Sequence, residues 1–264
     1  MTMLSRTADS LFWLARYMER AESIARLVLV GHRMANMALS LGNPGNEWRS
    51  TLIATGCEPG YLAKHGEVVP ALVVDYLVRD PDNPSSIVSC IETARRNARA
   101  VRTALTVDMW EALNETWQQT RALKPADLAA DKLAGLLEWV KQRSLLFSGA
   151  YANTMLRTDA YRFTQLGTTL ERADNTARIL DVKFHVLLPE TERVGGSLDY
   201  FQWTTILREV SALTAYHWVY RESVKPWLVA DLLILNRQMP RSLFSCYENL
   251  VRFLDQVARQ YGRI

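Results

Sequence analysis

The sequence predicts an all-α fold, an irregular bundle of about eight to ten helices in one domain over residues 1–264. Apolar residues recur at three- and four-residue spacing through most of the chain, which is the period of a half-buried helix. Glycine and proline gather in a few clusters, where they separate these stretches. Alternating apolar runs bounded by Asn-Gly or Asp-Gly turns are missing, so we expect no sheet.

The first half of the chain reads as a series of helices with clear start signals. The first helix is predicted to begin after a cap at Ser5 or Thr7 and to run to about residue 38. Asp82-Asn83-Pro84-Ser85-Ser86 combines a stop signal with a start signal, because proline and capping residues favour helix ends. It opens a long helix through Arg102 that continues or kinks into a following segment. Further segments are predicted at about 47–56, 67–79 and 109–113.

The second half is divided mainly by proline. Pro125 opens a predicted helix at about 126–156, and the next helix, at about 159–187, ends at Pro189 because proline cannot continue a helix. Three more helices, separated by Pro226 and Pro240, are predicted at about 197–220, 225–236 and 240–261.

Composition narrows the classes of function. With 48% hydrophobic and 22% charged residues the chain can bury a core. The net charge is only +3, which gives no general case for nucleic-acid binding. The basic residues are 25 arginines and 6 lysines, and arginine is the better partner for carboxylates and phosphates.

Cysteine usage and hydropathy suggest a cytoplasmic protein. The three cysteines are widely spaced and form no Cys-x-x-Cys pair, so neither a zinc site nor a disulfide framework is indicated. The polar N-terminus does not read as a signal peptide. The longest apolar stretches, such as Trp227 to Leu235, which contains Asp231, are far shorter than the roughly 20 residues that span a bilayer. We therefore expect no membrane segment.

One short pattern occurs three times: a glutamate, an alanine two residues later, and Ala-Arg six and seven residues later. It occupies residues 19–26, 92–99 and 171–178. Because seven residues make nearly two helical turns, each glutamate and its arginine lie on one face. The sequence between the copies is not repetitive. We therefore expect three helices whose Glu/Arg faces meet in one shared row of charged residues, here called the Glu/Arg seam.

The seam has a structural and a functional interpretation. In the structural one the glutamates pair with arginines across the bundle, since a half-paired buried charge costs about 3–5 kcal/mol. In the functional one the seam binds an acidic peptide or an amino acid. The expected pairs join Glu19, Glu92 and Glu171 with Arg26, Arg99 and Arg178.

Other residues offer alternative sites. Glu19 with Glu22, and Glu171 with Asp174, are carboxylates at i and i+3 that could hold Mg²⁺ or act in acid–base catalysis. The histidines do not follow the Glu-x-x-His spacing of di-iron bundles, so no metal and no cofactor is assigned.

Arginines also suggest an anion site. Three arginines on the helix of the second copy form a line that could bind an anion: Arg95, Arg99 and Arg102. Alternatively, these arginines pair with acidic residues of the first and third copies. Ser5 and Arg6 lie at a helix start that favours an anion, although ordinary capping is the favoured explanation. Nucleic acid is not expected, because aromatic residues do not interleave with the arginine line. The candidate binding residues are thus Ser5, Arg6, Glu19, Glu22, Arg26, Glu92, Arg95, Arg99, Glu171, Asp174 and Arg178, and no catalytic residue is assigned.

Several stretches resemble the bacterial alpha-E domain family. The stretches are residues 4–26, 98–102 leading to 109–114, 170–181, and 230–236 with 240–242. The resemblance implies an all-helical protein. Through the family's genomic company, it also implies a role beside circularly permuted ATP-grasp ligases and transglutaminase-like peptidases.

These observations favour an accessory protein over an autonomous catalyst. The sequence has no phosphate-binding loop, no dinucleotide fingerprint, no nucleophile elbow and no zinc-protease motif. We expect a helical partner of an ATP-grasp-type peptide or amide ligase that binds a peptide, an amino acid or the ligase at the Glu/Arg seam. The alternatives are a metal-assisted or acid–base enzyme that uses the paired carboxylates, and a purely structural scaffold.

Overall fold

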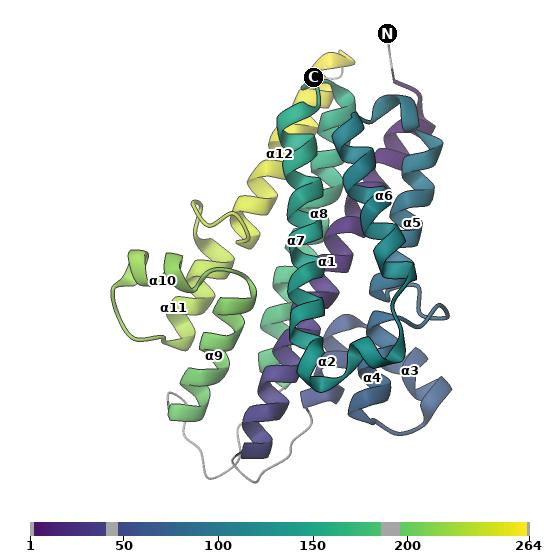
Figure 1. Ribbon diagram of the computed structural model, residues 1–264. Helices are drawn as coiled ribbons and strands as arrows, with labels where there is room; N and C mark the ends of the chain where they lie inside the picture. Colours follow the sequence, from purple (N-terminus) through teal and green to yellow (C-terminus); the bar gives the residue numbers. More distant parts are fainter. Residues whose placement is uncertain (1–2, 41–46, 186–195, 263–264) are drawn as a thin grey trace. The chain divides into compact units, whose positions relative to one another are not determined.

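The computed structural model describes residues 3–40, 47–185 and 196–262, and this part of the chain is all-α (Figure 1). Its twelve α-helices, with no strand in these ranges, confirm the predicted fold class. The first seven are α1 (Ser5–Ser40), α2 (Glu47–Thr55), α3 (Glu58–His65), α4 (Pro70–Val78), α5 (Ile87–Ala100), α6 (Val107–Arg121) and α7 (Ala130–Thr154). The other five are α8 (Asp159–His185), α9 (Ser197–Glu209), α10 (Leu213–Tyr220), α11 (Pro226–Ala230) and α12 (Leu243–Gln260).

Short elements of other geometry complete the chain. Two 3-10 turns, η1 (Arg102–Ala104) and η2 (Pro125–Leu128), precede α6 and α7, and the π-helical turn η3 (Asp231–Leu235) follows α11. Among the described helices, none is both long and apolar enough to cross a bilayer.

Among the differences from the predicted helices are one missed helix and one break. The helix α3 was missed because Pro59 and Gly60 read as breakers, whereas proline is well tolerated in a first helical turn. The predicted helix 197–220 is interrupted at Ser211, whose backbone has a left-handed φ of 57°. A serine gives no sequence signal for such a conformation, which is ordinarily left to glycine or asparagine.

The described chain divides into two compact units, each with its own apolar core. One unit, here called unit 1, comprises Met1–Ala25, Asp75–Arg172 and Tyr247–Ile264. Unit 2 comprises Arg26–Val74 and Ala173–Cys246. The core of unit 1 gathers side chains of α1, α5, α6 and α7, and the core of unit 2 gathers the later part of α1 with α8 to α11. One domain over the whole chain remains a prediction.

The starts of α5 and α12 have the same sequence and the same local geometry. Both carry Pro-x-Ser-x-x-Ser-Cys, at residues 84–90 and 240–246. The first serine, Ser86 or Ser242, accepts a hydrogen bond from the backbone N–H of the second, at 3.2 and 3.0 Å. The cysteine Sγ lies 3.9 and 3.8 Å from the carbonyl oxygen of the proline, as the donor. The two helix starts are therefore equivalent.

A second shared feature precedes α4 and α11. The hydroxyl of Tyr61 donates to the Glu67 carbonyl and accepts from the Val69 N–H, at 3.0 and 3.1 Å. The hydroxyl of Tyr216 donates to the Ser223 carbonyl at 2.8 Å and accepts from the backbone N–H two residues further on at 3.0 Å. Each tyrosine thus fastens a loop that leads into a helix beginning with proline.

The chain therefore contains two copies of one five-helix repeat, α1–α5 and α8–α12. In the described residues α6 and α7 have no counterpart after α12. The repeat was not predicted from the sequence, because it relates the residues after the first glutamate pattern to those after the third, and not the two stretches between the patterns. The copies share only scattered positions, and these become recognisable when local hydrogen bonds are compared.

Candidate functional site

The helices α1 and α8 approach each other very closely in unit 1. A Cβ atom placed on Gly167 would lie 2.2 Å from the Phe12 carbonyl oxygen and 3.2 Å from the Cβ of Ala15. No residue larger than glycine fits there without displacing the backbone. Gly167 lies beside Phe12 and Ala15, and Arg172 lies beside Glu19 further along, so the two helices run parallel.

Just beyond this contact, two Glu-Arg dipeptides bind each other. Arg172 donates from Nε and Nη2 to the two carboxylate oxygens of Glu19, at 3.0 and 3.1 Å. Arg20 donates in the same way to Glu171, at 2.6 and 3.0 Å. Each helix thus contributes one acid and one base to a reciprocal pair of forked contacts. We call these four residues, with Arg16, the ER cluster.

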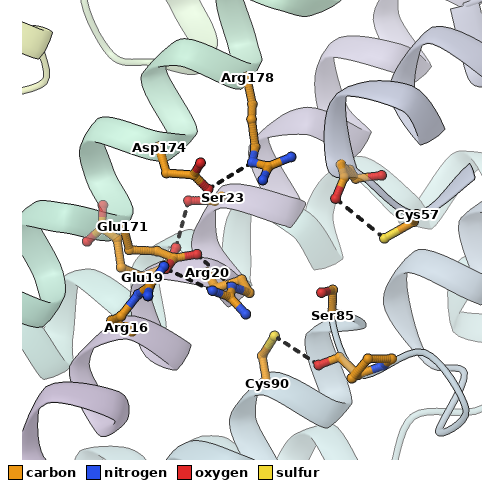
Figure 2. A network of polar contacts seen from close by, with 12 residues as sticks. Arg16, Glu19, Arg20, Ser23, Cys57, Ser85, Cys90, Glu171, Asp174 and Arg178 are labelled. Carbon is orange, nitrogen blue, oxygen red and sulfur yellow. Dashed lines mark hydrogen bonds and ion pairs between the residues drawn. The ribbon is translucent and has the colours of Figure 1, made fainter.

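Arg16 adds a third guanidinium on one side. Its Nε donates to Glu171 at 2.7 Å, and Figure 2 shows Arg16 and Arg20 converging on this carboxylate. Arg16 lies 5.0 Å from the ring centroid of Trp13, and Arg20 lies 5.2 Å from that of Tyr17. Both guanidinium groups therefore lie within cation–π distance of an aromatic ring, which favours their charged form.

The carboxylates of the ER cluster are buried, while its arginines reach the surface. The Glu19 and Glu171 side chains are 2% and 3% exposed, against 18% for Arg16 and 24% for Arg20 and Arg172. Two-pronged guanidinium contacts satisfy buried carboxylates well, and removing one partner would leave an uncompensated charge. The neighbouring Glu19 carboxylate raises the pKa of Arg172 well above its usual value, so this arginine stays charged.

The ER cluster is close to electrically neutral once Glu22 is included. Glu22 is 1% exposed, and its charge also contributes to the raised pKa of Arg172. Three guanidinium groups then face three carboxylates. Such a balanced and buried arrangement offers no surplus positive charge to an anionic ligand.

The last arginine of each pattern in unit 2 caps the end of a helix. Arg26 donates from Nη1 to the carbonyl of Glu209, the last residue of α9. Arg178 donates from Nη1 to the carbonyl of Ala54 near the end of α2, at 3.0 Å. Carbonyl groups in a last helical turn lack partners within the helix, and a cation there is favourable. Because α2 follows α1 and α9 follows α8, each repeat caps the other.

The second copy of the pattern, at residues 92–99, does not join the first and third copies. Glu92 is exposed and accepts a hydrogen bond from the indole N–H of Trp117, and Arg99 is exposed without an ion pair in the described residues. The predicted three-helix Glu/Arg seam is therefore wrong, and a two-helix cluster takes its place. Of the arginines expected to pair with these glutamates across the bundle, Arg178 contacts none of them, and Glu171 pairs with Arg16 and Arg20. Spacing along one helix states which residues share a face, but not which helix that face meets.

Arg178 instead pairs with Asp174 one turn earlier, at 2.8 Å, and both side chains are about two-fifths exposed. Such an exposed pair contributes little to stability.

The arginine line on α5 takes part in a ladder of arginines and tryptophans. Arg95 lies 3.6 Å from the ring centroid of Trp117 and 5.8 Å from that of Trp110, and its Nε donates to Asn114 at 3.0 Å. Arg102 lies 5.0 Å from Trp110 on the same ladder. The expectation that aromatic residues do not interleave with this line is wrong, because α6 supplies them. Each ring already has guanidinium neighbours, so the ladder fastens α5 to α6.

The start of α1 differs in detail from the prediction. The helix begins at Ser5 itself, and the Leu4 carbonyl accepts the backbone N–H groups of Thr7 and Ala8, at 2.9 and 3.1 Å. Neither Ser5 nor Thr7 caps the helix with its side chain. Ser5 and Arg6 are exposed, and Arg6 has no ion pair in the described residues.

The carboxylate pairs of the metal hypothesis have other partners. Glu171 accepts from two arginines, and Asp174 pairs with Arg178. Within the described ranges no group of three or more histidine, cysteine, aspartate or glutamate side chains is arranged to hold a metal ion.

Sequence reasoning missed three members of the ER cluster, Arg16, Arg20 and Arg172. A signal was present, because Glu-Arg-Ala followed by an acid occurs at residues 19–22 and again at 171–174. Aligning these two copies alone, without the second pattern, would have drawn attention to the arginine that follows each glutamate.

Comparison with known proteins gives a family and a few distant relatives. The sequence model of the Alpha-E family, described as a predicted alpha-helical domain with a conserved ER motif, matches residues 3–263. Uncharacterized proteins of Mycobacterium bovis and of two Mycobacterium tuberculosis strains are 26% identical over 270 residues. The match covers 93% of this chain but only 29% of each relative's length. No solved structure matches the chain significantly.

Proposed function

Because the chain belongs to the Alpha-E family, and its ER cluster leaves no carboxylate available for chemistry, we propose that it is a helical accessory protein of an ATP-grasp-type peptide or amide ligase system. In this proposal the protein binds the ligase, or a transglutaminase-like protein of the same system, and contributes no catalytic group of its own. The ER cluster holds α1 and α8 in a fixed register.

One observation carries the non-catalytic part of the proposal. The carboxylates of Glu19 and Glu171 are almost fully buried, and each accepts two parallel guanidinium hydrogen bonds. A general base or a metal ligand needs a lone pair that can reach a substrate or an ion. Here the lone pairs are directed at arginines, as expected for a structural element.

The length of the relatives supports an accessory role. In the mycobacterial proteins the matching segment makes up 29% of the polypeptide. A helical domain of this kind therefore works next to much longer stretches of other protein. The ATP-grasp partner itself rests on the family resemblance.

A small ligand at the seam has less support than a protein partner. With Glu22 included, the three arginines of the ER cluster face an equal number of acids, and Arg16 and Arg20 also contact aromatic rings. A free amino acid or an acidic peptide would have to compete with buried carboxylates that are already bonded. The ligase is thus the favoured partner.

We extend the proposal to a cytoplasmic location. All three cysteines are buried and none forms a disulfide, which agrees with a reducing compartment.

Co-purification tests the partnership. A tagged full chain is co-expressed with the ATP-grasp-type ligase from the same genome, and the eluate is examined by size-exclusion chromatography. We expect both proteins in one peak at a fixed ratio, and ligase turnover that changes when this chain is added. Separate elution with unchanged turnover would overturn the proposal. An ATP-grasp-type enzyme from an unrelated system is the matched control and should elute alone.

A further inference from the structure

An open hollow of about 690 Å³ lies in unit 1 between the N-terminal part of α1, α8 and α12. Apolar side chains form most of its wall, and Ser5 and Asp9 contribute polar groups. We call this hollow the α8–α12 groove. Its size and lining are typical of a place where another molecule binds.

The walls of the α8–α12 groove correspond, residue by residue, to the core of the first repeat. On α8 the correspondence is counted from Glu171 and Glu19, which occupy the same place in the two repeats. All three α8 residues of the groove have counterparts in the core of unit 1. The pairs are Phe163 and Leu11, Leu166 and Leu14, and Leu170 and Met18.

The same holds for α12. Here the correspondence is counted from the equivalent caps Ser242 and Ser86. All three α12-side residues of the groove again match core residues of the first repeat. The pairs are Leu250 and Ala94, Leu254 and Ala98, and Tyr261 and Leu105.

In the first repeat, α6 and α7 cover these positions. The helix α6 packs against α5, and α7 packs against α6, as Figure 1 shows. Their large side chains fill the core at spacings of one helical turn. These side chains are Met109 and Leu113 from α6, and Phe147 and Tyr151 from α7.

The second repeat keeps the same face uncovered in the described chain. Leu254 is 55% exposed, whereas its counterpart Ala98 is fully buried. Other apolar residues on α12, Tyr247 and Val251, are exposed nearby. A contiguous apolar surface of this kind on a folded protein commonly marks an interaction site.

We propose that the α8–α12 groove is a docking site for an amphipathic helical hairpin of a partner protein, which binds as α6 and α7 bind in the first repeat. Each helix of the hairpin presents large apolar residues at i and i+4 to the groove. Ser5 and Asp9 remain at the polar rim of the interface. The inference does not depend on the partnership with a ligase, because it follows from the internal repeat alone.

The test supplies the groove with a second copy of the hairpin formed by α6 and α7. A second copy of residues 106–156 is joined through a flexible linker to the C-terminus of the full chain, which gives a high effective concentration. We expect the melting temperature to rise by about 5 °C or more and the exposed groove to lose its binding of an apolar fluorescent dye. An unchanged melting temperature, with dye binding retained, would overturn the proposal.

Two controls show whether the hairpin docks in the α8–α12 groove. In the extended chain Leu254→Lys should abolish the gain, whereas Leu235→Lys, at a similarly exposed leucine in unit 2, should preserve it. Met109→Asp with Phe147→Asp in the appended copy alone should also abolish the gain. A gain that survives Leu254→Lys would mean that the hairpin binds elsewhere, which contradicts the proposal.

Discussion

The two repeats have equivalent frames but differ in what covers them. In the first repeat, α6 and α7 bury a face on which α5 carries the small residues Ala94 and Ala98. In the second repeat the same positions of α12 are Leu250 and Leu254, and the face is open. The comparison teaches that helix caps, loop hydrogen bonds and helix contacts determine the backbone arrangement of a repeat. A neighbouring element then decides whether a position belongs to the core or to the surface.

The ER cluster, which both repeats build together, offers the largest effect. Glu171→Gln would leave Arg16 and Arg20 without their carboxylate and should lower the free energy of unfolding by about 3 kcal/mol, as measured by urea denaturation. The exposed Glu92→Gln, at the same position of the second pattern, should change it by less than about 0.5 kcal/mol. Equal losses would show that the burial of Glu171 has no energetic consequence.

The close approach of the repeats at Gly167 gives the next effect. Gly167→Ala places a methyl group against the Phe12 carbonyl and should cost about 1–3 kcal/mol in thermal or chemical unfolding. Gly135 lies within α7 with open space around it, so Gly135→Ala should stabilise the protein by about 0.5–1 kcal/mol. A neutral Gly167→Ala would contradict the tight contact between α1 and α8.

The loop tyrosines test whether the two frames are equivalent. Tyr61→Phe and Tyr216→Phe each remove a hydroxyl that both donates to and accepts from the backbone, and each should cost about 1–2 kcal/mol. Urea denaturation of both variants checks this. A large loss for one tyrosine and none for the other would break the equivalence.

The helix caps test the same equivalence with a smaller effect. Ser86→Ala and Ser242→Ala should each cost about 1 kcal/mol, because each serine accepts a backbone N–H in the first turn of its helix. Thermal unfolding of the single and double variants should show additive losses, since the caps belong to separate helices. Strong coupling would contradict two independent frames.

The smallest predicted effect is a pH dependence of stability that comes from His32, in the first repeat. Burial, followed by the charge of Arg33, lowers the pKa of His32 below its usual value, so the unfolded chain takes up a proton more readily. The stabilising contribution is complete above the unfolded pKa of about 6.5 and is lost as pH falls toward the folded pKa. Melting temperatures measured from about pH 7.5 to about pH 5.5 should fall more for the wild type than for His32→Gln. A parallel fall would contradict the role of His32.

The sequence predicts the fold class and most helix ranges because apolar periodicity and proline are local signals. It predicts α1, α7, α8 and α12 closely, since each combines a long periodic stretch with a clear stop. It misses the break at Ser211, where a residue with no special sequence signal has a left-handed backbone. Local sequence signals therefore predict most helices of each repeat.

The candidate site was predicted less completely. The buried glutamates Glu19 and Glu171 were identified, but their partners were not, because the pairing depends on which helices meet. Glu92 has the same pattern and lies at the surface. The groove was not predicted at all, since it is defined by the absence of a covering element in the described chain rather than by any motif.

The most direct measurement is a double-mutant cycle between α1 and α8. Glu19→Gln, Arg172→Met and the double variant are compared by urea denaturation, because these side chains form one arm of the reciprocal ER pairing. The pairing predicts a coupling free energy of about 1–3 kcal/mol. Losses that simply add, within about 0.5 kcal/mol, would contradict it.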